Sequence, residues 1–161
     1  MHRRELFGRV GSLFDQEANK SYIRPPYYCD GNSFYEYCKS CDGACAKVCQ
    51  SKIIVILKDQ TPVLDFAQSG CTYCDECAVA CDFEVLSIEN KAHIDATVSI
   101  DTQGCMSWHQ TICFACKEPC LDDAIRFEGM FKPSIDMSKC TSCGFCIAKC
   151  PTNAIKIQRG R

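Results

Sequence analysis

The last cysteine run of the chain limits its fold more than any other feature of the sequence. Cys140, Cys143, Cys146 and Cys150 are spaced C-x2-C-x2-C-x3-C, and Pro151 follows them. In this spacing three thiolates on a tight loop can bind three corners of one [4Fe-4S] cubane, while the fourth cysteine typically ligates the other cluster of a pair. The run therefore predicts a partner run and a core built around metal clusters.

Three further runs precede it. They are Cys38, Cys41, Cys45 and Cys49; Cys71, Cys74, Cys77 and Cys81; and Cys105, Cys113, Cys116 and Cys120. The first has an extra residue between its second and third cysteines, where Asp42-Gly43 can form a wider loop. The second has Asp82 in place of proline, and the third has a wide first gap that contains His109. We predict all sixteen cysteines as metal ligands and interpret His109 as a polar loop residue.

Cysteine makes up 17 of the 161 residues, and the seventeenth, Cys29, lies outside every cluster spacing. We predict that Cys29 is a free thiol. The aliphatic and aromatic residues left after the cysteines are few for one large domain and suit two small ones. Metal clusters would supply the missing core, so we expect the metal-free chain to be largely unfolded. Reduced thiolates also favour a cytoplasmic location.

A repeat of apolar residues follows each run. Four, five and seven residues after the last cysteine come Ile53, Ile54 and Ile56; Val85, Leu86 and Ile88; Ala124, Ile125 and Phe127; and Ala154, Ile155 and Ile157. Each set predicts a short strand, and 62–64 and 133–135 predict partner strands. The sequence thus predicts an α+β fold of two ferredoxin-like units, 34–95 and 96–161, each with short hairpins and short helices around two [4Fe-4S] clusters.

The gaps between the runs suggest how they pair. There are 21 residues between Cys49 and Cys71 and 19 between Cys120 and Cys140, enough for a strand, a turn and a strand. We expect the first run to pair with the second and the third with the fourth. Crossed ligation then gives the sets Cys38, Cys41, Cys45 and Cys81; Cys71, Cys74, Cys77 and Cys49; Cys105, Cys113, Cys116 and Cys150; and Cys140, Cys143, Cys146 and Cys120. A nested pairing of first with fourth and second with third stays open, because the central gap of 23 residues is similar.

Zinc is the competing interpretation, because C-x2-C pairs also bind Zn as four-sulfur tetrahedra. Zinc sites use two such pairs and give no reason for third and fourth cysteines at regular offsets, so the spacing favours iron-sulfur clusters. The formal net charge of -2 would fall to roughly -10 with four clusters bound. This charge disfavours nucleic acid and favours proteins with a basic docking face. The longest apolar run, 53–57, is too short to span a membrane.

Residues 1–33 form a basic N-terminal arm and a Pro-containing linker in this interpretation. Arg3, Arg4, Phe7 and Arg9 belong to a segment whose apolar spacing suits a short amphipathic helix. The Arg3-Arg4 pair is similar to the start of a twin-arginine export signal, but no apolar region follows it, so we expect no export. We predict that these four residues dock a protein partner; a helix packed on its own domain fits the periodicity equally well.

The whole pattern resembles the NapF family, ferredoxin-type proteins of the periplasmic nitrate reductase system. The resemblance is carried by the stretched third run, the regular fourth run with Pro151, the Arg3-Arg4 pair and Ile23-Arg24-Pro25-Pro26. It implies a cytoplasmic protein with four [4Fe-4S] clusters that contacts the precursor of the nitrate reductase catalytic subunit before export. It further implies that the protein assists cofactor maturation by electron or iron-sulfur donation.

Two functions stay open at this point, because cysteine spacing alone indicates only a multi-cluster redox protein. The first is the maturation role, and the alternative is a soluble multi-cluster electron-transfer ferredoxin. The sequence contains no nucleophile-base arrangement and no phosphate-binding loop, so we expect no enzymatic activity of its own.

Overall fold

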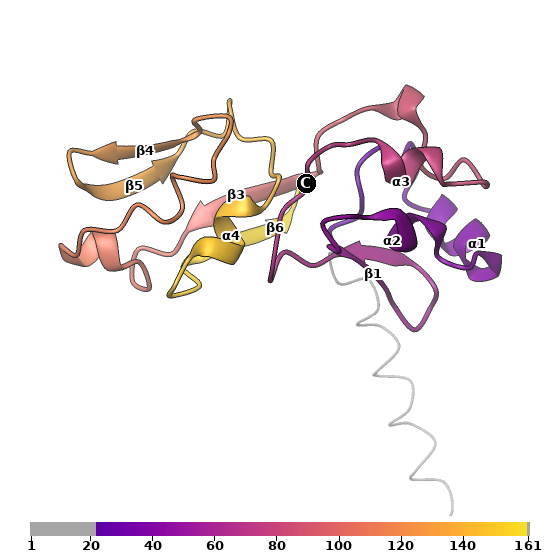
Figure 1. Cartoon of the computed structure of the whole chain (residues 1–161), viewed down its shortest axis with the longest axis horizontal. Helices are drawn as coiled ribbons and strands as arrows, with labels where there is room; N and C mark the ends of the chain where they lie inside the picture. Colours follow the sequence, from indigo (N-terminus) through magenta and orange to yellow (C-terminus); the bar gives the residue numbers. More distant parts are fainter. Residues whose placement is uncertain (1–21, 161) are drawn as a thin grey trace, which may run out of the picture.

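The computed structural model describes residues 22–160 and has an α+β fold of short helices and strands. Figure 1 shows these elements in two groups. The first group contains α1 (Ser33–Tyr37), η3 (Cys38–Ser40), α2 (Ala44–Val48), β1 (Ile54–Ile56), β2 (Pro62–Leu64), α3 (Glu76–Val79) and η4 (Ile88–Asn90). The second contains β3 (Ala96–Ile100), η5 (Met106–His109), β4 (Ile125–Glu128), β5 (Phe131–Ile135), α4 (Phe145–Lys149) and β6 (Ile155–Arg159).

Each group has an antiparallel hairpin and a second pairing that joins its beginning to its end. The hairpins are β1 with β2, where Val55 lies opposite Val63, and β4 with β5. In the second group β3 pairs antiparallel with β6, placing Val98 opposite Ile157. In the first group a single antiparallel bridge between Tyr28 and Leu86 takes the equivalent place. Both ends of each group are therefore tied together by backbone hydrogen bonds.

The apolar repeat predicts three strands correctly and one wrongly. The sets that begin at Ile53, Ala124 and Ala154 correspond to β1, β4 and β6. The set Val85, Leu86 and Ile88 was expected to form a strand, yet only Leu86 makes a bridge and the chain then enters η4. The reason is Ser87, whose hydroxyl oxygen accepts a hydrogen bond from the Glu89 amide and so starts a helical turn.

The segment 23–28 is not a linker. It has no helical turn, as the prolines indicate, and it bends at 26–27, where Tyr27 has a φ of +76°. It packs in the first group: Arg24 is only 7% exposed and Tyr27 only 2%. The Ile23 carbonyl accepts from the Leu64 amide at 2.8 Å, and the Tyr27 carbonyl accepts from the Ser87 amide at 2.9 Å. Proline dictates the backbone conformation and does not determine whether other elements cover the segment.

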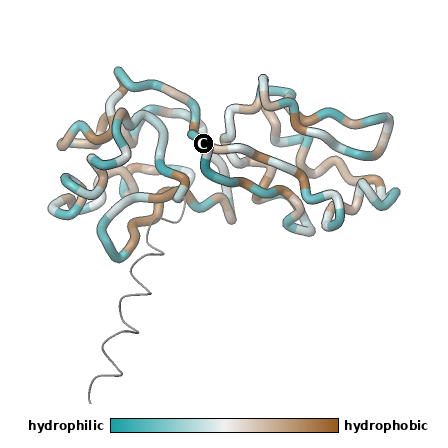
Figure 2. The backbone as a smooth tube through the Cα atoms, turned by 180° about the vertical axis from the view of Figure 1, so that it is seen from behind, coloured by the Kyte–Doolittle hydropathy of each residue, from teal (hydrophilic) through white to brown (hydrophobic). Residues whose placement is uncertain are grey.

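The apolar side chains form two small cores, one in each group. Phe34 and Leu86 are among the most buried residues of the first, and Ile125 and Val98 of the second. In Figure 2 hydrophobic stretches alternate with hydrophilic turns along the tube. Cysteines of the first two runs pack against the first core, and cysteines of the last two runs pack against the second. None of the helices found in residues 22–160 has the length and the apolar character needed to span a bilayer.

Candidate metal centres

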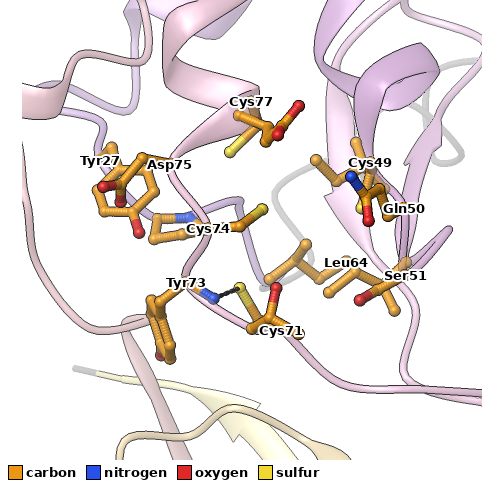
Figure 3. Close-up of a pocket in the computed structure, with 15 residues that line it drawn as sticks. Tyr27, Cys49, Gln50, Ser51, Leu64, Cys71, Tyr73, Cys74, Asp75 and Cys77 are labelled. Atoms are coloured by element: carbon orange, nitrogen blue, oxygen red, sulfur yellow. Dashed lines mark hydrogen bonds between the residues drawn. The ribbon is translucent and has the colours of Figure 1, made fainter.

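The second cysteine run faces the last cysteine of the first run across one cavity. The cavity has a volume of about 30 Å³. Figure 3 shows the cysteines that line it, Cys49, Cys71, Cys74 and Cys77. Cys77 lies on α3, and Cys49 is the C-cap residue directly after α2. Apolar side chains such as Ile54 and Leu64 complete the lining. This set is the one that crossed ligation between the first and second runs requires.

The fourth run likewise faces the last cysteine of the third run across one cavity. Cys140, Cys143, Cys146 and Cys120 line a cavity of about 20 Å³. A further cavity of about 20 Å³ is lined by Cys105, Cys113, Cys116 and Cys150. Each cavity thus combines three cysteines of one run with the last cysteine of the other. The third run is therefore paired with the fourth. The cavities in the described residues do not show the nested pairing, in which the first run would pair with the fourth.

The irregular first run also gathers its cysteines with the last one of the second run. Burial raises the pKa of Cys38 to about 11 and that of Cys45 to about 12. The neighbouring Cys41 and Cys81 raise both pKa values further, because a second negative charge close by disfavours the thiolate. Cys81 therefore lies close enough to the first run to interact electrostatically with it.

A left-handed residue stands two positions before the third cysteine in the first, second and fourth runs. These residues are Gly43 (φ +75°), Asp75 (φ +65°) and Gly144 (φ +85°), and each precedes the helix that carries the third cysteine. The left-handed conformation turns the chain sharply from loop to helix. In the first run the extra residue, Asp42, lies before this turn and forms an ion pair with Lys47. The wider loop therefore leaves the turn itself intact.

Backbone amides donate hydrogen bonds to several of the sulfurs. Cys81 Sγ accepts from the Leu86 amide and Cys120 Sγ from the Ala124 amide, both at 3.4 Å, and Cys150 Sγ accepts from the Ala154 amide at 3.2 Å. Hydrogen bonds to sulfur help to set the reduction potential of an iron-sulfur cluster. The last cysteine of each of these three runs is thereby held by the backbone of the segment that follows it.

The pKa values of the thiols describe the electrostatics of the cavities. Burial raises the pKa of Cys77 and Cys146 to about 12, and neighbouring cysteines add to the effect. At Cys150 burial also acts to raise the pKa, but hydrogen bonds from Thr152 and Ala154 outweigh it and lower the value. At neutral pH a thiol with a pKa as high as that of Cys77 stays protonated until a bound cation stabilises its thiolate. The donor set is therefore suited to metal.

Four thiolates around an apolar cavity fit a thiophilic metal centre. In the part of the chain that the structure describes, no three Cys, His, Asp or Glu side chains form a group that could hold a single metal ion. A zinc ion about 2.3 Å from each sulfur would draw four thiolates together on one point. The cysteines here instead surround a cavity, which is what a multi-iron cluster requires.

Comparison with known proteins identifies the family. Residues 133–156, which contain the whole fourth run, match the family model described as a 4Fe-4S binding domain. The ferredoxin-type protein NapF of Escherichia coli K12 is 31% identical over 137 residues, which cover 83% of this chain and 82% of that protein. The chain belongs to the NapF family. It is therefore a ferredoxin-type iron-sulfur protein that binds a [4Fe-4S] cluster.

Two other relatives show how much of the chain the similarity covers. NapF of Haemophilus influenzae is 30% identical over 161 residues, covering 95% of this chain and 90% of that protein. A component of the ion-translocating oxidoreductase complex of Methanosarcina acetivorans is 29% identical over 192 residues, covering 96% of this chain and 70% of that component. Similarity thus extends over nearly the whole chain.

Cys29 and His109, which were also singled out in the sequence of this NapF-family chain, line none of the four-cysteine cavities. Cys29 is exposed and free. His109 is exposed, and its Nε2 lies 3.0 Å from the Gln103 carbonyl oxygen, as suits a polar loop residue. Arg3, Arg4, Phe7 and Arg9 fall outside the described residues 22–160, so their predicted docking role stays a prediction.

Two tyrosines beside the second run were missed by the sequence analysis. Tyr27 lines the cavity of Cys71 and Cys77, and its hydroxyl is buried beside the Asp75 carboxylate without meeting the geometry of a hydrogen bond. Burial, followed by the adjacent Asp75 carboxylate, raises the pKa of Tyr27. Tyr73 lies between Cys71 and Cys74 and reaches the fourth run. Its place between two cysteines was visible in the sequence, but the contact with the other half was not.

Proposed function

We propose that this protein holds four [4Fe-4S] clusters, two in each of two ferredoxin-like units comprising 34–95 and 96–161. The observation that carries this proposal is the repeated four-cysteine set, seen around three cavities and in the mutual charge effects of the first run with Cys81. The first unit also includes 23–28, because this segment packs in its core.

We infer that these clusters serve another protein. The NapF family suggests as partner the catalytic subunit of periplasmic nitrate reductase in its precursor form. The protein would dock on this subunit in the cytoplasm before export and donate electrons or iron-sulfur units during cofactor maturation. In this proposal it catalyses no reaction of its own. A cytoplasmic location suits thiolates that must stay reduced.

Docking is assigned to four N-terminal residues, the basic Arg3, Arg4 and Arg9 and the apolar Phe7. The cluster-bearing part of the chain becomes strongly acidic when clusters bind, because each oxidised cubane with four thiolates carries about -2. A basic arm attached to an acidic body gives two surfaces of opposite charge. A precursor with an acidic groove and a basic face would be attracted by both.

The test is an anaerobic pull-down with the holo protein as bait. Precursor and mature forms of the catalytic subunit are offered separately, after iron and sulfide content has been confirmed. We expect retention of the precursor and weaker retention of the mature form. The double variant Arg3→Glu and Arg4→Glu should lose the precursor. The control reverses two exposed charges in the body of the chain, Lys58→Glu and Lys132→Glu, and should retain it.

The second candidate function is a soluble electron-transfer ferredoxin. It is favoured by the similarity to the Methanosarcina acetivorans protein, whose name places it in an oxidoreductase complex. In that case the bait would retain neither form of the catalytic subunit, and a generic low-potential reductase would reduce it rapidly. Retention of the precursor by wild type and not by the Arg3→Glu/Arg4→Glu variant would contradict this second function.

A further inference from the structure

The two groups of elements meet at the loops of the second and fourth cysteine runs. The amide of Cys71 donates a hydrogen bond to the carbonyl oxygen of Cys143, with 2.7 Å between nitrogen and oxygen. Both residues line four-cysteine cavities, Cys71 in the first group and Cys143 in the second. A single hydrogen bond thus connects a residue of one candidate centre directly to a residue of another.

A side-chain hydroxyl of each loop reaches backbone outside its own run, and that of Tyr73 joins the two loops. Tyr73 donates from its hydroxyl to the Thr141 carbonyl and accepts from the Ile94 amide at 3.1 Å. In the fourth run the buried Ser142 donates to the Ala96 carbonyl at 2.6 Å. Tyr73 and Ser142 occupy equivalent positions, each directly before the second cysteine of its run, and both are left-handed, with φ of +53° and +57°. Each loop therefore presents a hydroxyl to backbone outside its own run.

Two glycines allow this close approach. A Cβ added at Gly70 would lie 2.5 Å from the Phe145 amide nitrogen and 2.6 Å from the Cys143 carbonyl oxygen. A Cβ at Gly144 would overlap the ring of Phe66. Backbone atoms on the facing loop cannot rotate away as a flexible side chain can. The contact between the two loops consequently requires glycine at position 70.

We propose that this junction is the route by which one electron passes between the two halves of the chain, with Tyr73 as the residue that positions it. The inference rests on the proposed function, because both loops must carry clusters, which supply one-electron donor and acceptor when bound. The electron leaves the second-run site and arrives at the fourth-run site. No bond forms or breaks in this transfer, and no proton moves.

The junction gives the four sites a defined order. Each site is numbered here by the run that supplies three of its cysteines. Within each half, crossed ligation shares the cysteines of two runs between two sites, so the first site adjoins the second and the third adjoins the fourth. The Cys71–Cys143 hydrogen bond adds the connection between the second and the fourth. The resulting order is first, second, fourth, third, which differs from the order of the runs in the sequence. An electron that enters at the first run therefore crosses the junction between Cys71 and Cys143 before it reaches the third.

The experiment uses the full-length holo protein with a photoreductant attached to Cys29, which is exposed and belongs to the first group. A flash reduces the first half, and rapid-freeze electron paramagnetic resonance follows arrival of the electron in the second half. Signals of the two halves are assigned with Cys77→Ser and Cys146→Ser. The test variants are Tyr73→Phe and Gly70→Ala. The matched control is Tyr37→Phe, which removes a phenol hydroxyl from a side chain that is 43% exposed and lies in α1.

We expect both test variants to slow arrival in the second half, with iron content and reduction of the first half unchanged. The control should transfer at the wild-type rate. In Tyr73→Phe the Ile94 amide should exchange its hydrogen roughly five-fold faster, because it loses a hydrogen bond worth about 1 kcal/mol. This exchange measurement confirms that the hydrogen bond between the Ile94 amide and the Tyr73 hydroxyl has been lost.

Transfer at the wild-type rate in a variant with faster Ile94 exchange would overturn the inference. Retention of the nitrate reductase precursor by that same variant would show that the proposed function stands without it. Iron contents that exclude a cluster at the second or the fourth run would overturn the inference and the four-cluster proposal together. Iron content and precursor binding thus distinguish failure of the proposed electron route from failure of the proposed function.

Discussion

Replacing Gly70 with alanine tests the contact between the two halves most severely. The added methyl group would lie within 2.6 Å of two backbone atoms, the Phe145 nitrogen and the Cys143 oxygen. Carbon and these atoms normally stay more than 3 Å apart, so one of the two loops has to move. The movement also breaks the hydrogen bond between the Cys71 amide and the Cys143 carbonyl.

The expected cost combines overpacking with the lost hydrogen bond. Inserting a methyl group into a well-packed contact costs about 1–3 kcal/mol, and a backbone hydrogen bond contributes about 1 kcal/mol net. The free energy of unfolding should therefore fall by about 2–4 kcal/mol. For a chain of this size each kcal/mol shifts the melting temperature by roughly 2–4 °C, which gives a decrease of roughly 4–16 °C.

The assay is an anaerobic thermal melt of the holo protein, followed by circular dichroism at one fixed scan rate because cluster loss makes unfolding irreversible. Gly31→Ala is the matched control: a Cβ there would meet nothing within 4 Å, so its unfolding free energy should stay within about 0.5 kcal/mol of wild type. If Gly70→Ala melted together with Gly31→Ala, the loops of the second and fourth runs would not be in contact.

Three further predictions concern Arg24, Cys29 and the buried thiols. Arg24→Met removes the guanidinium that donates to the Thr61 hydroxyl at 2.8 Å and to two further acceptors, so the unfolding free energy should fall by about 2–4 kcal/mol; an unchanged urea midpoint would refute this. Cys29→Ser should leave the iron content unchanged, and in wild-type holo protein iodoacetamide should modify Cys29 alone, as peptide mass spectrometry would report; alkylation of any other cysteine would count against its assignment as a ligand. Burial raises the pKa of Cys77 and Cys146 to about 12, so the reactive thiolate becomes more abundant as pH rises. Cluster reconstitution should accordingly become faster between about pH 7 and pH 9, and a rate that falls over this range would contradict the prediction.

Cysteine spacing predicted the arrangement of the candidate centres because ligand geometry is local. A C-x2-C-x2-C loop must curl around a common point, and the fourth cysteine must point away from it. The sets around the cavities, such as Cys49 with Cys71, are those that crossed ligation requires. Ligation of iron by these cysteines, the unit boundaries and the docking role of Arg3 and Arg4 stay predictions.

The features that sequence reasoning missed depend on contacts between distant segments. Ile23-Arg24-Pro25-Pro26 indicates extended backbone, but its burial depends on Thr61 and on the aromatic rings of Phe34 and Tyr35, which face the Arg24 guanidinium. Tyr73 gave no local signal of its role, since its hydroxyl reaches Thr141, 68 positions away. Periodicity also could not reveal that Ser87 would end the pairing after Leu86. Local patterns determine loops and strands, whereas the junction arises only when both halves are folded.

The most direct test of the four-cluster proposal is the iron, sulfide and zinc content of the protein purified without oxygen, measured on the same sample as protein concentration. Four clusters of four irons each predict about sixteen iron and sixteen sulfide per chain, with no stoichiometric zinc. A content of about eight iron per chain would leave half of the cysteine sets without the clusters assigned to them. Stoichiometric zinc without sulfide would contradict the proposal altogether.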